Sequence, residues 1–164
     1  MTSHSTHIAS DCDSKNLNVL FKNLENEVKS FSPFKGDLLS ERENKLLKRY
    51  LDATRSEMFF ASAIIYVEGV GEQFIIPTIA KEVFGFSLAE NNISVIPIHS
   101  RYFDPYLKIV QNNHLEIPVV AIIDGDSDEL DGTDDETTTA VENAKALEVS
   151  GRVVVSSGNK TLEI

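Results

Sequence analysis

The chain has 164 residues, of which 41% are hydrophobic and 25% are charged, and its formal net charge is −11. This acidic balance argues against a simple DNA-binding domain, which carries an excess of Lys and Arg. Cys12 is the only cysteine, which excludes an internal disulfide and fits a reducing cytoplasm. No apolar stretch reaches the roughly 18 residues of a membrane-spanning helix, and no signal peptide precedes the first polar segment. We therefore expect one compact domain with an appendage, in the cytoplasm and without membrane contact.

The N-terminal third predicts little regular structure apart from one helix. Residues 1–14 are a polar lead-in, and residues 17–31 are a mixed segment that resembles a short strand or loop followed by a polar connector. A helix then begins after Ser40, the expected N-cap, with Glu43 at the capping-box position. Leu46, Leu47, Tyr50 and Leu51 have the spacing of an apolar helix face, so this helix should pack on the rest of the chain.

The remaining sequence alternates strand and helix patterns. Three short apolar runs rich in β-branched residues predict strands that are buried on both faces: Ala63–Val67, residues 93–98 and Val119–Ile123. The expected helices and the final strand lie at residues 72–84, 104–113, 137–147 and 152–155. This order implies βαβ units and right-handed crossovers. The predicted fold class is therefore α/β, with a parallel β-sheet flanked by helices and preceded by a short helical connector.

Carboxylates follow two of the predicted strands. Glu68 ends the first strand, and Glu72 lies in the first turn of the next helix, where the helix dipole favours a negative charge. Asp124, Asp126 and Asp128 follow the third strand. If the two strands are neighbours in a parallel sheet, both clusters meet at its carboxyl edge, where α/β sheets place their sites. Converging carboxylates repel unless a cation neutralises them, and oxygen ligands suit Mg²⁺ or Mn²⁺. The sequence thus predicts a metal-dependent site for phosphodiester chemistry.

The aspartate run has three competing interpretations. An EF-hand loop spaces aspartates in this way, but it needs glycine at the sixth position, which is Glu129 here, and it follows a helix rather than a strand. A phosphatase of the haloacid dehalogenase type phosphorylates the first aspartate of Asp-x-Asp, but it has no use for a strand ending in Glu-Gly. A solvated acidic loop without function is the interpretation for residues 134–136, but not for Asp124 and Asp126.

The motifs also resemble a known family. Val-Glu-Gly at residues 67–69 together with Asp-Gly-Asp at residues 124–126 resembles a Toprim domain, the metal-binding module of topoisomerases, primases and certain nucleases. Four further motifs, in this order and spacing, are similar to the OLD (overcoming lysogenization defect) family of ATP-dependent endonucleases. They are residues 56–61 (SEMFFA), 68–72 (EGVGE), 74–77 (FIIP) and 161–163 (TLE). The resemblance covers roughly residues 52–164 and implies a metal-dependent DNA endonuclease.

The resemblance implies two cations, Mg²⁺ or Mn²⁺, and assigns roles to individual residues. Glu68, Asp124 and Asp126 would be catalytic and would hold one cation. The residues that would help to hold the second are Glu72, Asp128 and Glu163. Arg101, which follows the second strand, is a candidate for phosphate contact. Family members carry a transition-state lysine beyond the Thr-Leu-Glu motif, whereas this sequence stops at Ile164, so we expect weak or no cleavage by this chain alone.

The N-terminus adds a separate resemblance. Residues 2–10 (TSHSTHIAS) are similar to the switch-histidine loop that closes the ATPase domain of ABC-type proteins, which would make His4 the counterpart of the residue near the ATP γ-phosphate. The sequence holds no Gly-x-x-x-x-Gly-Lys-Ser/Thr phosphate loop. We therefore expect residues 1–14 to be the end of an ABC-type ATPase domain, residues 15–55 a helical connector, and residues 56–164 a Toprim domain truncated at its C-terminus.

These expectations leave a choice between two functions. The first is the catalytic region of a larger endonuclease, with DNA and an ABC-type ATPase domain as partners and a homodimer left open. The second is a catalytically weak module that acts through protein contacts or metal-dependent nucleic-acid binding. A primase or topoisomerase is a third reading, but no tyrosine-bearing or zinc-binding companion module accompanies the motifs.

Overall fold

The structure is a computed structural model that describes residues 2–23, 25–51, 55–100, 102–124 and 135–158. Its helices are α1 (Thr6–Asp11), α2 (Glu41–Tyr50), α3 (Val70–Phe84), α4 (Asp104–Ile109) and α5 (Asp135–Lys145). Three 3₁₀ turns accompany them, η1 (Ser14–Asn16), η2 (Arg55–Phe59) and η3 (Ala89–Asn91). The strands are β1 (Val19–Lys22), β2 (Val28–Phe31), β3 (Ala63–Val67), β4 (Ile93–Pro97), β5 (Val119–Ile123) and β6 (Val153–Ser157).

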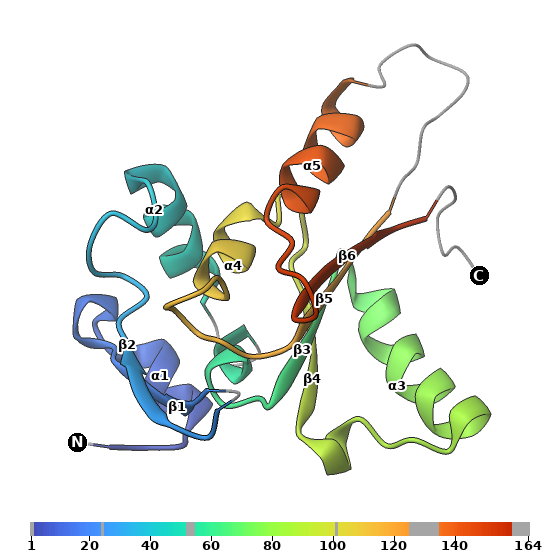
Figure 1. Ribbon diagram of the computed structural model, residues 1–164, viewed down its shortest axis with the longest axis horizontal. Coiled ribbons are helices and arrows are strands. Elements are labelled where there is room, and N and C mark those ends of the chain that lie inside the picture. The colour runs from blue at the N-terminus through green and yellow to red at the C-terminus, as the bar shows by residue number, and fades with distance from the viewer. Residues whose placement is uncertain (1, 24, 52–54, 101, 125–134, 159–164) are drawn as a thin grey trace.

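A four-stranded parallel sheet with the order β4-β3-β5-β6 forms the centre of the molecule. The chain leaves β3 for β4 through α3, then crosses back over β3 through α4 to reach β5, and α5 leads on to β6 (Figure 1). Because parallel crossovers are right-handed, this reversal of direction places α3 on one face of the sheet and α4 and α5 on the other. The predicted α/β fold with a parallel sheet flanked by helices is confirmed.

Most of the hydrophobic core lies on the α4 and α5 face. Tyr66, Phe103, Tyr106 and Ile123 are almost completely buried there and belong to one cluster of contacting side chains. A smaller cluster lies under α3 and contains Val67. β3 and β4 lie between two layers, which explains why their sequences are continuously apolar rather than alternating. The sequence predicts the same burial for β5, and this prediction is wrong at Val120, because this side chain is 38% exposed on the α3 face.

The element boundaries agree closely with the sequence. The strands Ala63–Val67 and Val119–Ile123 have the predicted bounds, and α2 carries the predicted capping box, in which Ser40 and Glu43 bond each other's backbone N–H groups. The helix expected at residues 104–113 ends earlier, at Ile109, and Asn113 has a positive φ of 66° that a helix does not allow. The sequence therefore overestimates this helix by one turn.

The expected helical connector at residues 15–55 also contains a two-stranded antiparallel sheet, where the sequence predicts one short strand or a loop. β1 pairs with β2, with Val19 opposite Phe31. These two side chains are buried against the main core, whereas most of the other side chains in the pair are exposed. Short strands of this kind depend on packing with distant residues, so their local sequence pattern is weak.

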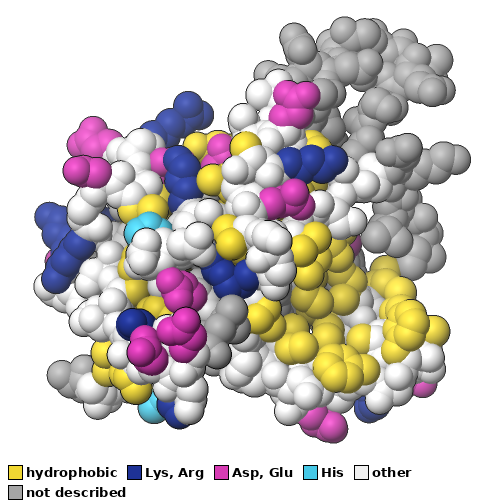
Figure 2. Space-filling view, in the orientation of Figure 1, with side chains coloured by type: hydrophobic (Ala, Val, Ile, Leu, Met, Phe, Trp, Pro, Cys, Tyr) yellow, Lys and Arg dark blue, Asp and Glu magenta, His cyan; other side chains and the backbone are white. Residues whose placement is uncertain are grey.

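The face of the sheet that carries α3 presents many apolar side chains to solvent. Helix α3 buries none of its residues, and Phe74, Val83 and Phe84 are about 70% exposed or more, at 69%, 68% and 76%. Val120 and Val154, paired on β5 and β6, are exposed on the same face. Figure 2 shows the resulting hydrophobic area over α3 and the neighbouring strands. Within the described ranges, no helix is both long and apolar enough to cross a bilayer.

Candidate metal site at the carboxyl edge of the sheet

Strands β3 and β5 bring two predicted site residues to one edge of the sheet. The strands are parallel neighbours with Tyr66 opposite Ala121, so Glu68 and Asp124 both follow a carboxyl end. The backbone N–H of Asp124 donates a hydrogen bond of 2.8 Å to the Glu68 carboxylate oxygen Oε1. The predicted adjacency of these two strands is confirmed, and the first carboxylate contacts the backbone of the second.

The backbone of Glu68 is also held from the other side. The N–H of His99 donates to the Glu68 carbonyl oxygen at 2.8 Å, which extends the ladder between β3 and β4 beyond the end of both strands. Because Glu68 is bonded to the residues that follow β4 and β5, its position is set by both neighbouring strands.

Glycine at position 69 leaves room for the carboxylate of Glu72 to lie against the backbone. Gly69 is the N-cap of α3, and a Cβ placed on it would lie only 3.0 Å from Glu72 Oε2. The Glu72 side chain therefore folds back over Gly69, the residue that follows Glu68 in the chain. The backbone of Gly69 is extended, with φ of −128°, so space rather than strain favours glycine here.

The donor atoms suit a hard divalent cation, but the described residues supply only part of a site. Glu68, Glu72 and Asp124 offer carboxylate oxygens, the ligands that Mg²⁺ and Mn²⁺ prefer. Across the described ranges, no three His, Cys, Asp or Glu side chains come close enough together to hold a metal ion. The other predicted site residues of this edge lie outside the described residues: Arg101, Asp126, Asp128 and Glu163.

His4 lies elsewhere. Its ring is 6.4 Å from the ring of Phe60, centroid to centroid. Phe60 precedes β3, whereas Glu68 follows it, so His4 and the acidic residues are at opposite ends of this strand. The predicted role of His4 near a nucleotide stays a prediction, and it is separate from the carboxyl edge.

A buried charge network that the sequence analysis missed lies between α2 and α4. The Glu43 carboxylate is 3% exposed and accepts hydrogen bonds from Lys108 Nζ at 2.7 Å and Tyr102 Oη at 3.3 Å. Burial alone would raise the pKa of Glu43, but its bonds to Lys108 and Ser40 outweigh burial and lower the pKa to about 2. The sequence showed Glu43 only as a helix cap, because its other partners are 59 and 65 positions away.

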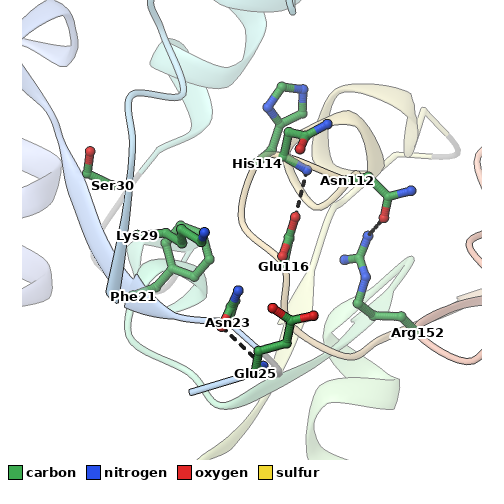
Figure 3. Close-up of a pocket in the computed structure, with 10 residues that line it drawn as sticks. Phe21, Asn23, Glu25, Lys29, Ser30, Asn112, His114, Glu116 and Arg152 are labelled. Atoms are coloured by element: carbon green, nitrogen blue, oxygen red, sulfur yellow. Dashed lines mark hydrogen bonds between the residues drawn. The ribbon is translucent and has the colours of Figure 1, made fainter. Parts of the chain in front are cut away.

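The opposite edge of the sheet carries a polar pocket of about 500 Å³ (Figure 3). Arg152, just before β6, donates from Nη1 to the carbonyl oxygens of Val110 and Ile117 and from Nη2 to Asn112 Oδ1 at 2.9 Å. Burial lowers the pKa of this guanidinium. These bonds attach Arg152 to the segment between α4 and β5, which explains the burial of a charged side chain without a catalytic role.

A parallel sheet with carboxylates after the neighbouring strands β3 and β5 is the arrangement that the sequence predicts for a Toprim domain. Residues 59–126 match the family described as "Overcoming lysogenization defect protein-like, TOPRIM domain". These residues are thus similar to an OLD-like Toprim domain, and the match confirms the resemblance in the sequence.

Two solved structures are similar to this chain. The C-terminal region of the Burkholderia pseudomallei OLD protein is 30% identical, with a TM-score of 0.54 over 63% of this chain and 56% of that one. The C-terminal region of the Xanthomonas campestris pv. campestris OLD protein is 28% identical, with a TM-score of 0.46 over 65% and 54%. The chain thus spans little more than half the length of these regions. No curated protein matches it.

Proposed function

We propose that this chain is the metal-binding Toprim region of an OLD-type, ATP-dependent endonuclease that hydrolyses phosphodiester bonds in DNA. The observation that carries the proposal is the contact between Glu68 and the backbone of Asp124 at the carboxyl edge of a Toprim-type sheet. It juxtaposes the two residues expected to share a cation. Toprim domains generally bind divalent cations, and the carboxylates at this edge would be their ligands.

The chain's own residues would hold and orient the cations. Glu68 and Asp124, with Asp126, would bind the first, and Glu72, with Asp128 and Glu163, would bind the second. Bound cations would activate water and stabilise the leaving oxygen of an in-line displacement. The Glu68 carboxylate is well suited to this task because its backbone is bonded at His99 and its side chain at Asp124, which leaves it little freedom to reorient.

The remaining partners of the site belong to the same proposal. DNA is the proposed substrate, and Arg101 is the proposed phosphate contact. We propose an ABC-type ATPase domain in the longer protein, with residues 1–14 as its end, His4 near the nucleotide and residues 15–55 as the connector. The net charge of −11 means that positive groups from such a domain would have to supply most of the attraction to DNA.

The same charge favours one alternative, a catalytically weak module that binds metal or protein partners. A domain with a large negative net charge attracts DNA poorly, whatever its chemistry. The two functions differ in whether metal binding leads to cleavage.

Plasmid nicking tests the proposal. Supercoiled plasmid is incubated with this chain, and with a longer protein that contains it and the ATPase domain, in Mn²⁺ and in EDTA. We expect nicking by the longer protein in Mn²⁺, its loss in Glu68→Ala, and its retention in Glu90→Ala, which removes an exposed carboxylate at η3. Nicking that survives Glu68→Ala would contradict the proposed site. Metal binding by the wild type without nicking by either protein would favour the binding module.

A further inference from the structure

Glu43 is more deeply buried than its role as a helix cap requires. A capping-box glutamate needs only to reach back to the N-cap N–H, and the Glu43 oxygen Oε2 does so with Ser40 at 2.8 Å. Its other oxygen, Oε1, reaches Tyr102 and Lys108, which come from the far side of β4 in sequence. The Lys108 contact compensates the buried charge. The Tyr102 contact joins Glu43 to the loop between β4 and α4.

The loop between β4 and α4 connects Tyr102 to the acidic edge. Tyr102 N donates to Ser100 Oγ at 3.0 Å, and His99 N donates to the Glu68 carbonyl oxygen at 2.8 Å. Glu68 Oε1 in turn accepts from Asp124 N. Hydrogen bonds from Tyr102 to Glu43, from Tyr102 to Ser100 and from His99 to Glu68 therefore lie in succession between α2 and the two carboxylate residues.

The backbone of His99 supplies a second, independent observation. His99 has a φ of 56°, in the left-handed region that residues other than glycine rarely adopt. Such a conformation is less stable than an ordinary one and persists only where surrounding contacts hold it. His99 itself bonds the Glu68 carbonyl oxygen, and the bond from Tyr102 N to Ser100 Oγ follows directly after it in the chain.

We propose that Glu43 is a positioning residue, which holds Tyr102 and thereby fixes His99 and Glu68 at the carboxyl edge. The effect on metal binding rests on the proposed function, which assigns a metal site to the carboxyl edge. It assigns α2 a role beyond packing, because this helix lies ahead of the Toprim residues and still contacts a loop of the site. A displacement of α2 would therefore move Tyr102 and, with it, His99 and Glu68.

The test compares two variants that each remove one hydrogen bond of α2. Tyr102→Phe deletes only the hydroxyl that bonds Glu43 and leaves the Lys108 contact intact. Asn44→Ala is the matched control. It removes a hydrogen bond of 3.1 Å from α2 to the carbonyl oxygen of Leu39, which precedes the N-cap, and it does not touch Tyr102. Both variants should remain folded, which the melting temperature of the full chain would check.

Amide hydrogen exchange by NMR measures the positioning directly. In Tyr102→Phe we expect the His99 and Asp124 amides to exchange about fivefold faster, the factor that corresponds to one hydrogen bond. The Ile64 amide, bonded to the Pro118 carbonyl at the other end of β3, serves as the internal reference and should not change. In Asn44→Ala, the ratios among the exchange rates of these three amides should equal those of the wild type. Equal His99 exchange in Tyr102→Phe and the wild type would overturn the inference.

Mn²⁺ affinity then measures the functional consequence. Tyr102→Phe should weaken Mn²⁺ binding by a similar factor of about fivefold, and Asn44→Ala should not. Faster exchange with unchanged Mn²⁺ affinity would overturn the link between Glu43 and the metal site. A wild-type chain that binds no Mn²⁺ would instead refute the proposed function, and the exchange of His99 would then decide the positioning by itself.

Discussion

Neutralising Glu43 should destabilise the protein in a pH-dependent way. The folded-state pKa of this carboxyl is about 2, compared with 4.5 for a free glutamate. At about 1.4 kcal/mol per pKa unit, the ionised form of Glu43 contributes roughly 3 kcal/mol to the free energy of unfolding at pH 7. This magnitude matches the cost expected for breaking a buried ion pair, and the side chains of Glu43 and Lys108 are 4% and 34% exposed.

The sign of the pH dependence follows from the direction of the shift. Because folding lowers the pKa of Glu43, its contribution is fully present above about pH 4.5 and is lost as the pH falls towards 2. Glu43→Gln cannot ionise, so its stability lacks this component at every pH. The difference between the wild type and Glu43→Gln should therefore shrink by about 1 kcal/mol between pH 7 and pH 3.5.

Urea unfolding at pH 7 and pH 3.5 measures both quantities. Glu90→Gln, which neutralises an exposed glutamate, is the control and should change the free energy of unfolding by less than about 0.5 kcal/mol. A Glu43→Gln difference below about 1 kcal/mol at pH 7, or one that is the same at both pH values, would refute the reasoning.

Three other outcomes are expected. Mn²⁺ at about 100 times its dissociation constant should raise the free energy of unfolding by about 2.7 kcal/mol. Asp124→Ala should reduce this increase, although the backbone N–H of residue 124 can still bond Glu68. A melting temperature of the wild type that does not depend on metal would count against the site. Gly69→Ala should leave the fold intact but displace the carboxylate that its Cβ would meet at 3.0 Å, which a weaker Mn²⁺ affinity at unchanged melting temperature would reveal. Phe103→Ala, which truncates a side chain that is 0% exposed, should cost about 3–5 kcal/mol in urea unfolding. The same change at Phe84, which is 76% exposed, should cost less than about 1 kcal/mol, and equal losses would contradict the assigned burial.

The sequence alone determined the architecture of the Toprim region. Apolar runs at Ala63–Val67 and Val119–Ile123 are typical of parallel strands, and their alternation with helix patterns indicated a parallel α/β fold. Glu68 was recognisable for a similar reason, since a carboxylate at the end of a buried strand needs a partner. The capping box at Ser40 was equally readable, because all its atoms lie within one turn of helix.

Only the tertiary structure decided which distant groups meet. β1 and β2 form because Val19 and Phe31 pack on the core, and nothing in their own short segments requires it. Glu43 resembles an ordinary cap until α4 brings Lys108 to within 2.7 Å of it. Glu72 was expected at the acidic edge, but its fold over Gly69 depends on the path of the chain from β3 into α3. A capping box is encoded in neighbouring residues, whereas these contacts depend on how strands and helices pack, and this is why they appeared only in the folded chain.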